Sequence, residues 1–79
     1  LELNYSTSAV GSIRVEVQDE LGRPIPGLGL KSSVEMIGDE ISGTAAWDST
    51  TRLADWAGRA VRLRFVLRDA DLYSLRFHE

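Results

Sequence analysis

The sequence contains no cysteine and a single histidine, His78. Without cysteine, the chain can form neither disulfide bonds nor a thiolate metal site. One histidine beside the C-terminus cannot form a histidine metal cluster, and it argues against Ser–His or Cys–His catalysis. No run of about 18 apolar residues is present, so the sequence predicts no membrane-spanning helix.

Length and charge narrow the possibilities further. The chain has 79 residues, of which 9 are basic and 12 acidic, giving a net charge of −3. This length fits one small domain, and the acidic balance argues against nucleic acid as a partner. The chain begins Leu1-Glu2-Leu3, without methionine and already alternating. We therefore expect residues 1–79 to be one domain excised from a longer protein, whose location the sequence leaves open.

Two-residue alternation of apolar and polar residues dominates the chain and predicts half-buried antiparallel strands. It runs through residues 1–6, 13–18, 61–68 and 73–78. We predict an all-β fold: a small antiparallel β-sandwich, similar to a jelly roll, of six or seven short strands. A short helical turn is expected at residues 52–57, capped by Thr50 or Thr51 and ended by Gly58.

The middle of the chain is less regular. Residues 19–22 and 38–40 are predicted turns, and the two prolines make residues 23–27 extended. Further short strands are expected within residues 28–36 and at residues 44–47.

The last two alternating runs predict a hairpin whose loop spans residues 68–72. Its register places Phe65 opposite Leu75 and Tyr73 opposite Leu67 on the inner face. On the outer face, Arg64 is expected opposite Arg76, and Arg62 opposite His78. The predicted core comprises Leu3, Tyr5, Ile13, Val15, Val17, Leu30, Trp47, Leu53, Val61, Leu63, Phe65, Leu67, Tyr73, Leu75 and Phe77.

Two resemblances to known families arise from these segments. Val17–Asp19 followed by Gly22–Gly27 resembles the opening of transthyretin-like carboxypeptidase-regulatory domains. Nearly the whole chain is similar to a C-terminal β-sandwich module of bacterial proteins whose preceding domain is like an invertase-type (family 32) glycoside hydrolase propeller. The residues that carry this second resemblance are 11–17, the same turn at 22–27, 37–40, Trp47, Leu53, 57–65 and 69–74. It implies a secreted or periplasmic parent that acts on carbohydrate, with its catalytic carboxylates on the propeller.

Carboxylates are the first candidates for chemistry, because glycoside hydrolysis needs a pair of them. The pairs Asp19/Glu20, Asp39/Glu40 and Asp69/Asp71 all lie in predicted turns, where such residues bind backbone N–H groups. We therefore predict no catalytic residue, no cofactor and no metal site, although ligands gathered from several loops could hold calcium.

The two tryptophans are the candidates for carbohydrate binding, because exposed aromatic rings can stack on sugars. With only two Trp, two Tyr and two Phe in the chain, Trp47 and Trp56 are also needed in the core. Trp56 is the better candidate for exposure, since it lies in a short connecting turn.

Four arginines, Arg14, Arg62, Arg64 and Arg76, are predicted to point outward from strands. One interpretation is a solvated face balanced by Glu2 and Glu16 on neighbouring strands. The other is a domain interface, because arginine is enriched at interfaces and binds carboxylates with two hydrogen bonds.

These observations favour a non-catalytic accessory module that packs against the catalytic domain of a glycoside hydrolase-like parent. The first alternative is a carbohydrate-binding module that uses an exposed tryptophan. The second is a transthyretin-like structural domain of a secreted protein. We expect the upstream domain, and possibly carbohydrate, as partners, and neither nucleic acid nor membrane.

Overall fold

The computed structural model describes residues 1–77 and has the all-β architecture that the alternation predicts. Three strands, β1 (Glu2–Asp19), β2 (Asp39–Thr44) and β3 (Val61–Arg76), form one antiparallel sheet in the order β2-β1-β3. Among the described residues, the one helical element is a 3-10 turn, η1 (Leu53–Trp56). The predicted helical turn is thus confirmed. No helix in this part of the chain is long and apolar enough to cross a membrane.

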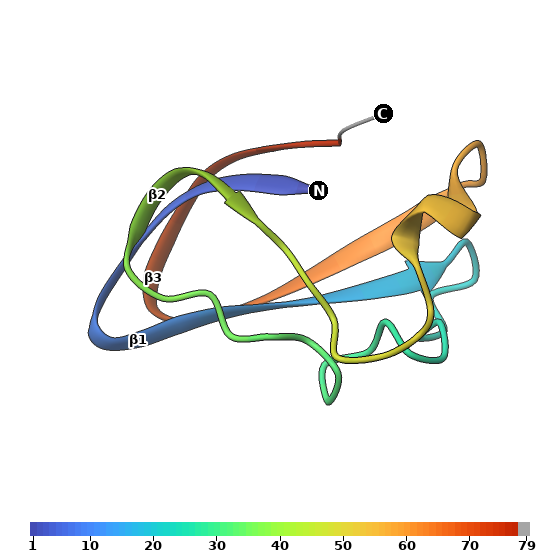
Figure 1. Cartoon of the computed structure of the whole chain (residues 1–79), viewed down its shortest axis with the longest axis horizontal. Coiled ribbons are helices and arrows are strands. Elements are labelled where there is room, and N and C mark those ends of the chain that lie inside the picture. Colours follow the sequence, from blue (N-terminus) through green and yellow to red (C-terminus); the bar gives the residue numbers. More distant parts are fainter. Residues whose placement is uncertain (78–79) are drawn as a thin grey trace.

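The sheet owes its layered shape to a bend in both long strands. Figure 1 shows β1 and β3 crossing the molecule, turning sharply at the same end and running back, so that the two halves of the sheet face each other. At the bend, pairing shifts from Thr7 with Ala70 to Ser12 with Arg68. Gly11 is buried here, so close to β3 that a Cβ atom would lie 2.3 Å from the carbonyl oxygen of Asp69. The fold is therefore a small sandwich made from two long bent strands rather than six or seven short ones.

The core lies between the two layers. Leu3 and Tyr5 from the first half of β1 pack with Ile13 and Val15 from its second half, and Met36 and Ala45 complete this cluster. A second cluster lies toward the end of β1 and consists of Val17, Ile25 and Leu28. The predicted burial of Leu3, Tyr5, Ile13, Val15 and Val17 is confirmed.

The segment between β1 and β2 follows the edge of β1 that faces away from β3. Asp19 and Gly22 close the predicted turn, with the Gly22 N–H donating to the Asp19 carbonyl at 2.9 Å and Gly22 at a φ of 83°. The extended proline segment then runs beside β1, where the Ile25 N–H donates to the Val17 carbonyl at 3.0 Å. Its extended course is as predicted.

The predicted short strands of the middle segment are displaced in the structure. Residues 28–36 form no strand and contribute only isolated bridges, Ile13 with Met36 and Ser33 with Trp47. The later strand is β2, which begins at Asp39 and ends at Thr44 instead of covering residues 44–47. The predicted Thr50 or Thr51 cap is also wrong, because Arg52 precedes η1 and no side chain caps it, whereas Gly58, with a φ of 82°, follows the end of the turn as predicted.

The predicted hairpin at the end of the chain is wrong. Residues 61–76 form one continuous strand, and Asp69, with a φ of 45°, bends it without reversing it. Both halves of β3 pair with β1: Phe65 lies opposite Val15, and Leu75 lies opposite Leu3. Arg62 lies opposite Gln18, and His78, its expected partner, lies outside the described residues.

A β-bulge explains why Tyr73 is not in the core. Asn4 pairs with Ser74, but Tyr5 pairs with Leu72, so Tyr73 has no partner on β1 and is 64% exposed. A bulge inserts one residue and reverses the inward and outward positions that follow it. Leu72 therefore contacts the core in its place.

The remaining predicted core residues divide into two groups. Leu67 and Leu75 are 45% and 42% exposed, and Phe77 is 53% exposed, so their predicted burial is wrong. The second group is half-buried and consists of Leu30, Trp47, Leu53, Val61, Leu63 and Phe65. Leu67 and Leu75 lie on β3, which is an edge strand of the sheet, and Phe77 follows its last residue.

Candidate functional site

The outer edge of β3 is open. Its neighbour in the sheet is β1, and no other strand among residues 1–77 pairs with it. The Ile13 and Val17 N–H groups donate to the Met36 and Leu28 carbonyls, on the side of β1 away from β3. Ile13 and Val17 therefore form non-hydrogen-bonded pairs with Leu67 and Leu63 in the antiparallel ladder. The pair of Val15 with Phe65, which lies between them, is of the same kind.

This pairing fixes the direction of the β3 backbone. In a non-hydrogen-bonded pair, the N–H and C=O groups of both residues point away from the partner strand. The backbone groups of Leu63, Phe65 and Leu67 consequently point to the open edge. Those of Arg62, Arg64 and the residues that alternate with them point to β1.

An apolar groove adjoins this edge at the mouth of the sandwich, opposite the bend. Its volume is about 680 Å³. Leu1 and Phe77 line it from one layer, and Trp56 and Val61 line it from the other, with Leu53, Ala54, Ala57, Gly58 and Arg59 completing the wall. The inner surfaces of the two layers are thus accessible here and along β3.

The four predicted interface arginines do not form one cluster. Arg14 forms an ion pair with Glu35, and Arg76 forms one with Glu2. Arg62 and Arg64 are exposed on β3. The bend places Arg76, the last residue of β3, in the other layer from Arg14, Arg62 and Arg64.

Acidic residues lie close to three of these arginines, because Glu35 pairs with Arg14, Glu2 pairs with Arg76 and Glu16 lies opposite Arg64. Arg64 lies opposite Glu16 rather than Arg76. The predicted contact between Arg64 and Arg76 is therefore wrong, because it depended on the hairpin.

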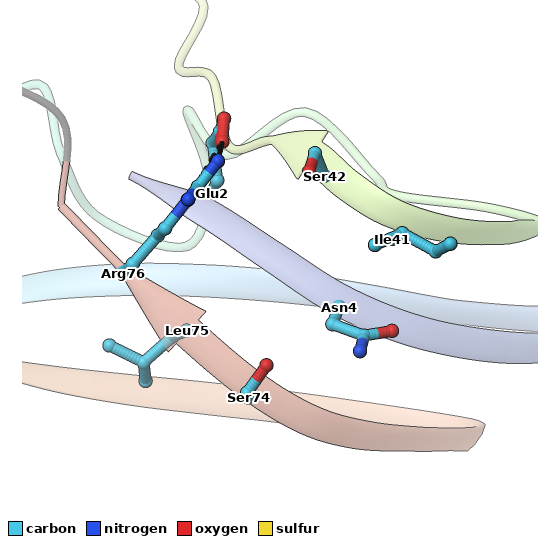
Figure 2. Close-up of a pocket in the computed structure, with 7 residues that line it drawn as sticks. All are labelled: Glu2, Asn4, Ile41, Ser42, Ser74, Leu75 and Arg76. Carbon is cyan, nitrogen blue, oxygen red and sulfur yellow. Dashed lines mark hydrogen bonds and ion pairs between the residues drawn. The ribbon is translucent and has the colours of Figure 1, made fainter.

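A polar hollow of about 280 Å³ crosses all three strands in the layer that holds the start of β1 and the end of β3. Figure 2 shows Arg76 reaching across to Glu2, with Asn4, Ser42 and Ser74 on β1, β2 and β3. The Arg76 Nη2 and Nε groups donate to the Glu2 Oε1 atom at 2.9 and 3.2 Å, and the Glu2 side chain is only 11% exposed. Glu2 is the one carboxylate among the lining residues, whereas glycoside hydrolysis needs two.

Trp47 has a structural position. Its ring packs against both core clusters. Its Nε1–H donates to the Val15 carbonyl at 2.9 Å. The polar group of this side chain is therefore used within the fold.

Trp56 lies at the surface of the second cluster, on the same inner face of η1 as Leu53. Its ring lines both the apolar groove and a smaller hollow of about 310 Å³ beside Asp19 and Glu20. The Arg59 guanidinium lies 5.0 Å from the ring centre, within cation–π range. Trp56 is thus half-buried, with part of its surface open to both hollows.

Of the three carboxylate pairs, only Asp19/Glu20 lies at a turn. The prediction that all three lie in turns is wrong, because Asp39 and Glu40 begin β2 and Asp69 and Asp71 lie within β3. Asp19 accepts hydrogen bonds from the Leu21 and Arg23 N–H groups at 2.9 and 3.0 Å, as a turn residue does. These bonds, that of Arg23 first, lower the pKa of Asp19. Asp39 accepts a bond from the Ser6 hydroxyl at 2.6 Å. Within residues 1–77, no three His, Cys, Asp or Glu side chains lie close enough together to hold a metal ion.

Two features of this surface were missed from the sequence. Arg68 lies on the outward face of β3 opposite Ser12, and its place in the alternation with Arg62 and Arg64 was the available signal. The openness of the β3 edge has no such signal, because alternating residues look the same in an edge strand and in a central strand of an antiparallel sheet.

Comparison of this chain with protein-family models, curated proteins and solved structures finds no match. The function must therefore be argued from the residues and their arrangement.

Proposed function

We propose that this chain is a non-catalytic accessory β-domain that packs against a neighbouring domain of a glycoside hydrolase-like protein. The observation that carries the proposal is the open side of the sandwich. Leu67 and Leu75, on the inner face of β3, and Phe77, which follows this strand, remain accessible, and Phe77 lines an apolar groove of about 680 Å³. An exposed apolar surface of this kind is typical of a protein–protein contact.

The charges around the open side support a folded, acidic neighbour. Arg62, Arg64 and Arg68 are exposed on the outward face of β3, and no ion pair within residues 1–77 involves them. Arginine at the rim of an apolar contact can bind carboxylates of a partner with two hydrogen bonds. The carbohydrate-active character of the neighbour is inferred from the sequence resemblance to modules that follow invertase-type propellers.

A non-catalytic role is supported by the surroundings of the carboxylates. Asp19 and Asp39 are engaged in local hydrogen bonds, and Glu2 is paired with Arg76. Asp19 and Glu20 both line the hollow of about 310 Å³, but they are neighbours in the chain and the Asp19 carboxylate is engaged by the Leu21 and Arg23 N–H groups. We therefore assign the chemistry to the neighbouring domain.

Hydrogen–deuterium exchange tests this proposal. The exchange of the 79-residue chain alone is compared with that of the same chain joined to its neighbouring domain. We expect slower exchange along β3 and around the apolar groove in the joined protein, and unchanged exchange in β2. Equal exchange in the two proteins would refute the packing role.

A matched pair of variants localises the contact. Phe77→Ser removes an exposed apolar side chain at the groove, whereas Ile41→Ser removes an exposed apolar side chain on β2. Phe77→Ser should restore fast exchange at the groove in the joined protein, and Ile41→Ser should not. The reverse result would place the contact on the other edge.

Carbohydrate binding through Trp56 is the second candidate, favoured by the accessibility of this ring to two hollows. Titration of the ¹⁵N-labelled chain with oligosaccharides would report on it through the two indole N–H signals. A shift confined to the Trp56 signal, and lost in Trp56→Ala, would support this role. The Trp47 signal serves as an internal control, because its N–H is bonded to Val15.

A further inference from the structure

The straight first half of β3, residues 61–68, offers a ready edge for one more strand. The N–H and C=O groups of Leu63, Phe65 and Leu67 point outward, as derived above from the pairing of β1. Proteins usually protect such edges by bulges, prolines or short strand length. Residues 61–68 contain no proline and pair with β1 without a register shift, so the protective device present there is the charge of its three arginines.

The side chains along this edge specify what an added strand would present. On the inner face, Leu63 and Phe65 are half-buried and Leu67 is exposed, so an incoming strand would complete the core with apolar residues. On the outward face, the same stretch presents Arg62, Arg64 and Arg68. Opposite charges on directly facing residues stabilise a pair of strands, and like charges destabilise it.

A second copy of this chain fits the edge poorly. Antiparallel pairing of residues 61–68 with the same residues of another copy brings arginines together in each register centred on residues 63 to 66. Centring on residue 64 places Arg64 opposite itself, and centring on residue 65 places Arg62 opposite Arg68. The charge pattern therefore favours a different strand over self-association.

We propose that the open edge of β3 is completed by an extended peptide strand of alternating apolar and acidic residues. This inference rests on the proposed function, because the neighbouring domain would supply the strand. Its backbone would bond to Leu63, Phe65 and Leu67, its apolar side chains would close the core, and its carboxylates would face Arg62, Arg64 and Arg68. Backbone bonds then give affinity, and the alternating side chains give specificity.

A synthetic peptide tests this proposal on the chain itself. The probe has about eight residues, within the usual length of a strand, alternates valine with glutamate and has blocked ends. It is titrated into the ¹⁵N-labelled chain, and amide exchange is followed by NMR. At saturation, we expect exchange at Leu63, Phe65 and Leu67 to slow by about tenfold or more, while Arg62 and Arg64, already bonded to β1, change little.

Charge reversal provides the specificity control. Arg64→Glu should weaken binding of the valine–glutamate peptide by about tenfold and improve binding of a valine–lysine peptide. Arg52→Glu makes the same change of net charge at an exposed residue before η1 and should alter neither.

Three results would overturn the proposal. They are failure of the valine–glutamate peptide to slow exchange at these three amides, equal binding of the lysine peptide, and slowed exchange on β2 instead. Concentration-dependent association of the chain alone, with the same three amides protected, would assign the edge to a second copy. If the peptide fails but the joined protein still shows protection at the groove, the strand mode falls and the accessory role stands.

Discussion

Gly11 should tolerate no side chain, and Gly11→Ala tests the bend that gives the sheet its two layers. A Cβ atom at this position would lie 2.3 Å from the Asp69 carbonyl oxygen and 2.6 Å from that of Arg68. Both obstacles are backbone atoms of β3, so no side-chain rotation can relieve the overlap.

The expected cost follows from the shift that the two strands must make. An ordinary contact needs about 3.4 Å, so β1 and β3 must separate locally by about 1.1 Å. Overpacking of this kind costs about 1–3 kcal/mol, and each ladder hydrogen bond lost adds about 1 kcal/mol. Alanine also lowers the conformational entropy of the unfolded chain, which offsets about 0.4–1 kcal/mol of this destabilisation. We therefore expect a net loss of about 2–3 kcal/mol, a large share of the roughly 4–12 kcal/mol typical of a chain this long.

Urea unfolding, followed by tryptophan fluorescence and far-ultraviolet circular dichroism, measures this loss. Gly29→Ala is the matched control, because the nearest atom to its added Cβ is the Glu16 Oε2 atom at 3.9 Å. That variant should be as stable as the parent chain or slightly more so. Equal stability of the Gly11→Ala and Gly29→Ala variants would refute the close approach of β1 and β3 at the bend.

Three further predictions concern single side chains. Trp47→Phe leaves the Val15 carbonyl without its indole donor and should lower the free energy of unfolding by about 1–3 kcal/mol in urea titration. The Arg23 N–H bond lowers the pKa of Asp19, so its stabilising effect is present above about pH 4 and lost as the pH falls below that value. Asp19→Asn should therefore show a smaller loss of stability on acidification than the parent chain. Burial, with a smaller effect of Glu40, raises the pKa of Tyr5, so stability should fall above about pH 10. That fall should be smaller in Tyr5→Phe, and an equal fall would contradict the assignment.

Alternation of apolar and polar residues predicted the strands well where successive side chains point in turn into the core and into solvent. Ile13, Val15 and Val17 are buried for this reason, and the all-β class and the helical turn follow from similar local signals. The alternation does not indicate whether two alternating runs belong to one strand or to two. Residues 61–68 and 73–77 therefore looked like a hairpin, although Asp69 only bends one long strand.

The surface of β3 shows the same division between local and long-range information. The sequence identifies Arg62 and Arg64 as outward residues, because parity alone decides it. Their neighbours depend on a ladder between segments that are far apart in the chain, so Glu16 opposite Arg64 could not be read from local spacing. The bulge at Tyr73 has no distinctive residue type, and its effect on burial appears only in three dimensions.

The pairing of Glu2 with Arg76 also determines when the sheet can be completed during synthesis. These residues are 74 positions apart, and every pair between β1 and β3 joins an early segment to a late one. At about 5–20 residues per second, synthesis from Glu2 to Arg76 takes roughly 4–15 s. During that time the 18 residues of β1 have no β3 to pair with, although they provide most of the core. Aggregation of nascent chains through β1 therefore competes with folding, and chaperones that bind extended apolar segments during translation should raise the yield of folded protein.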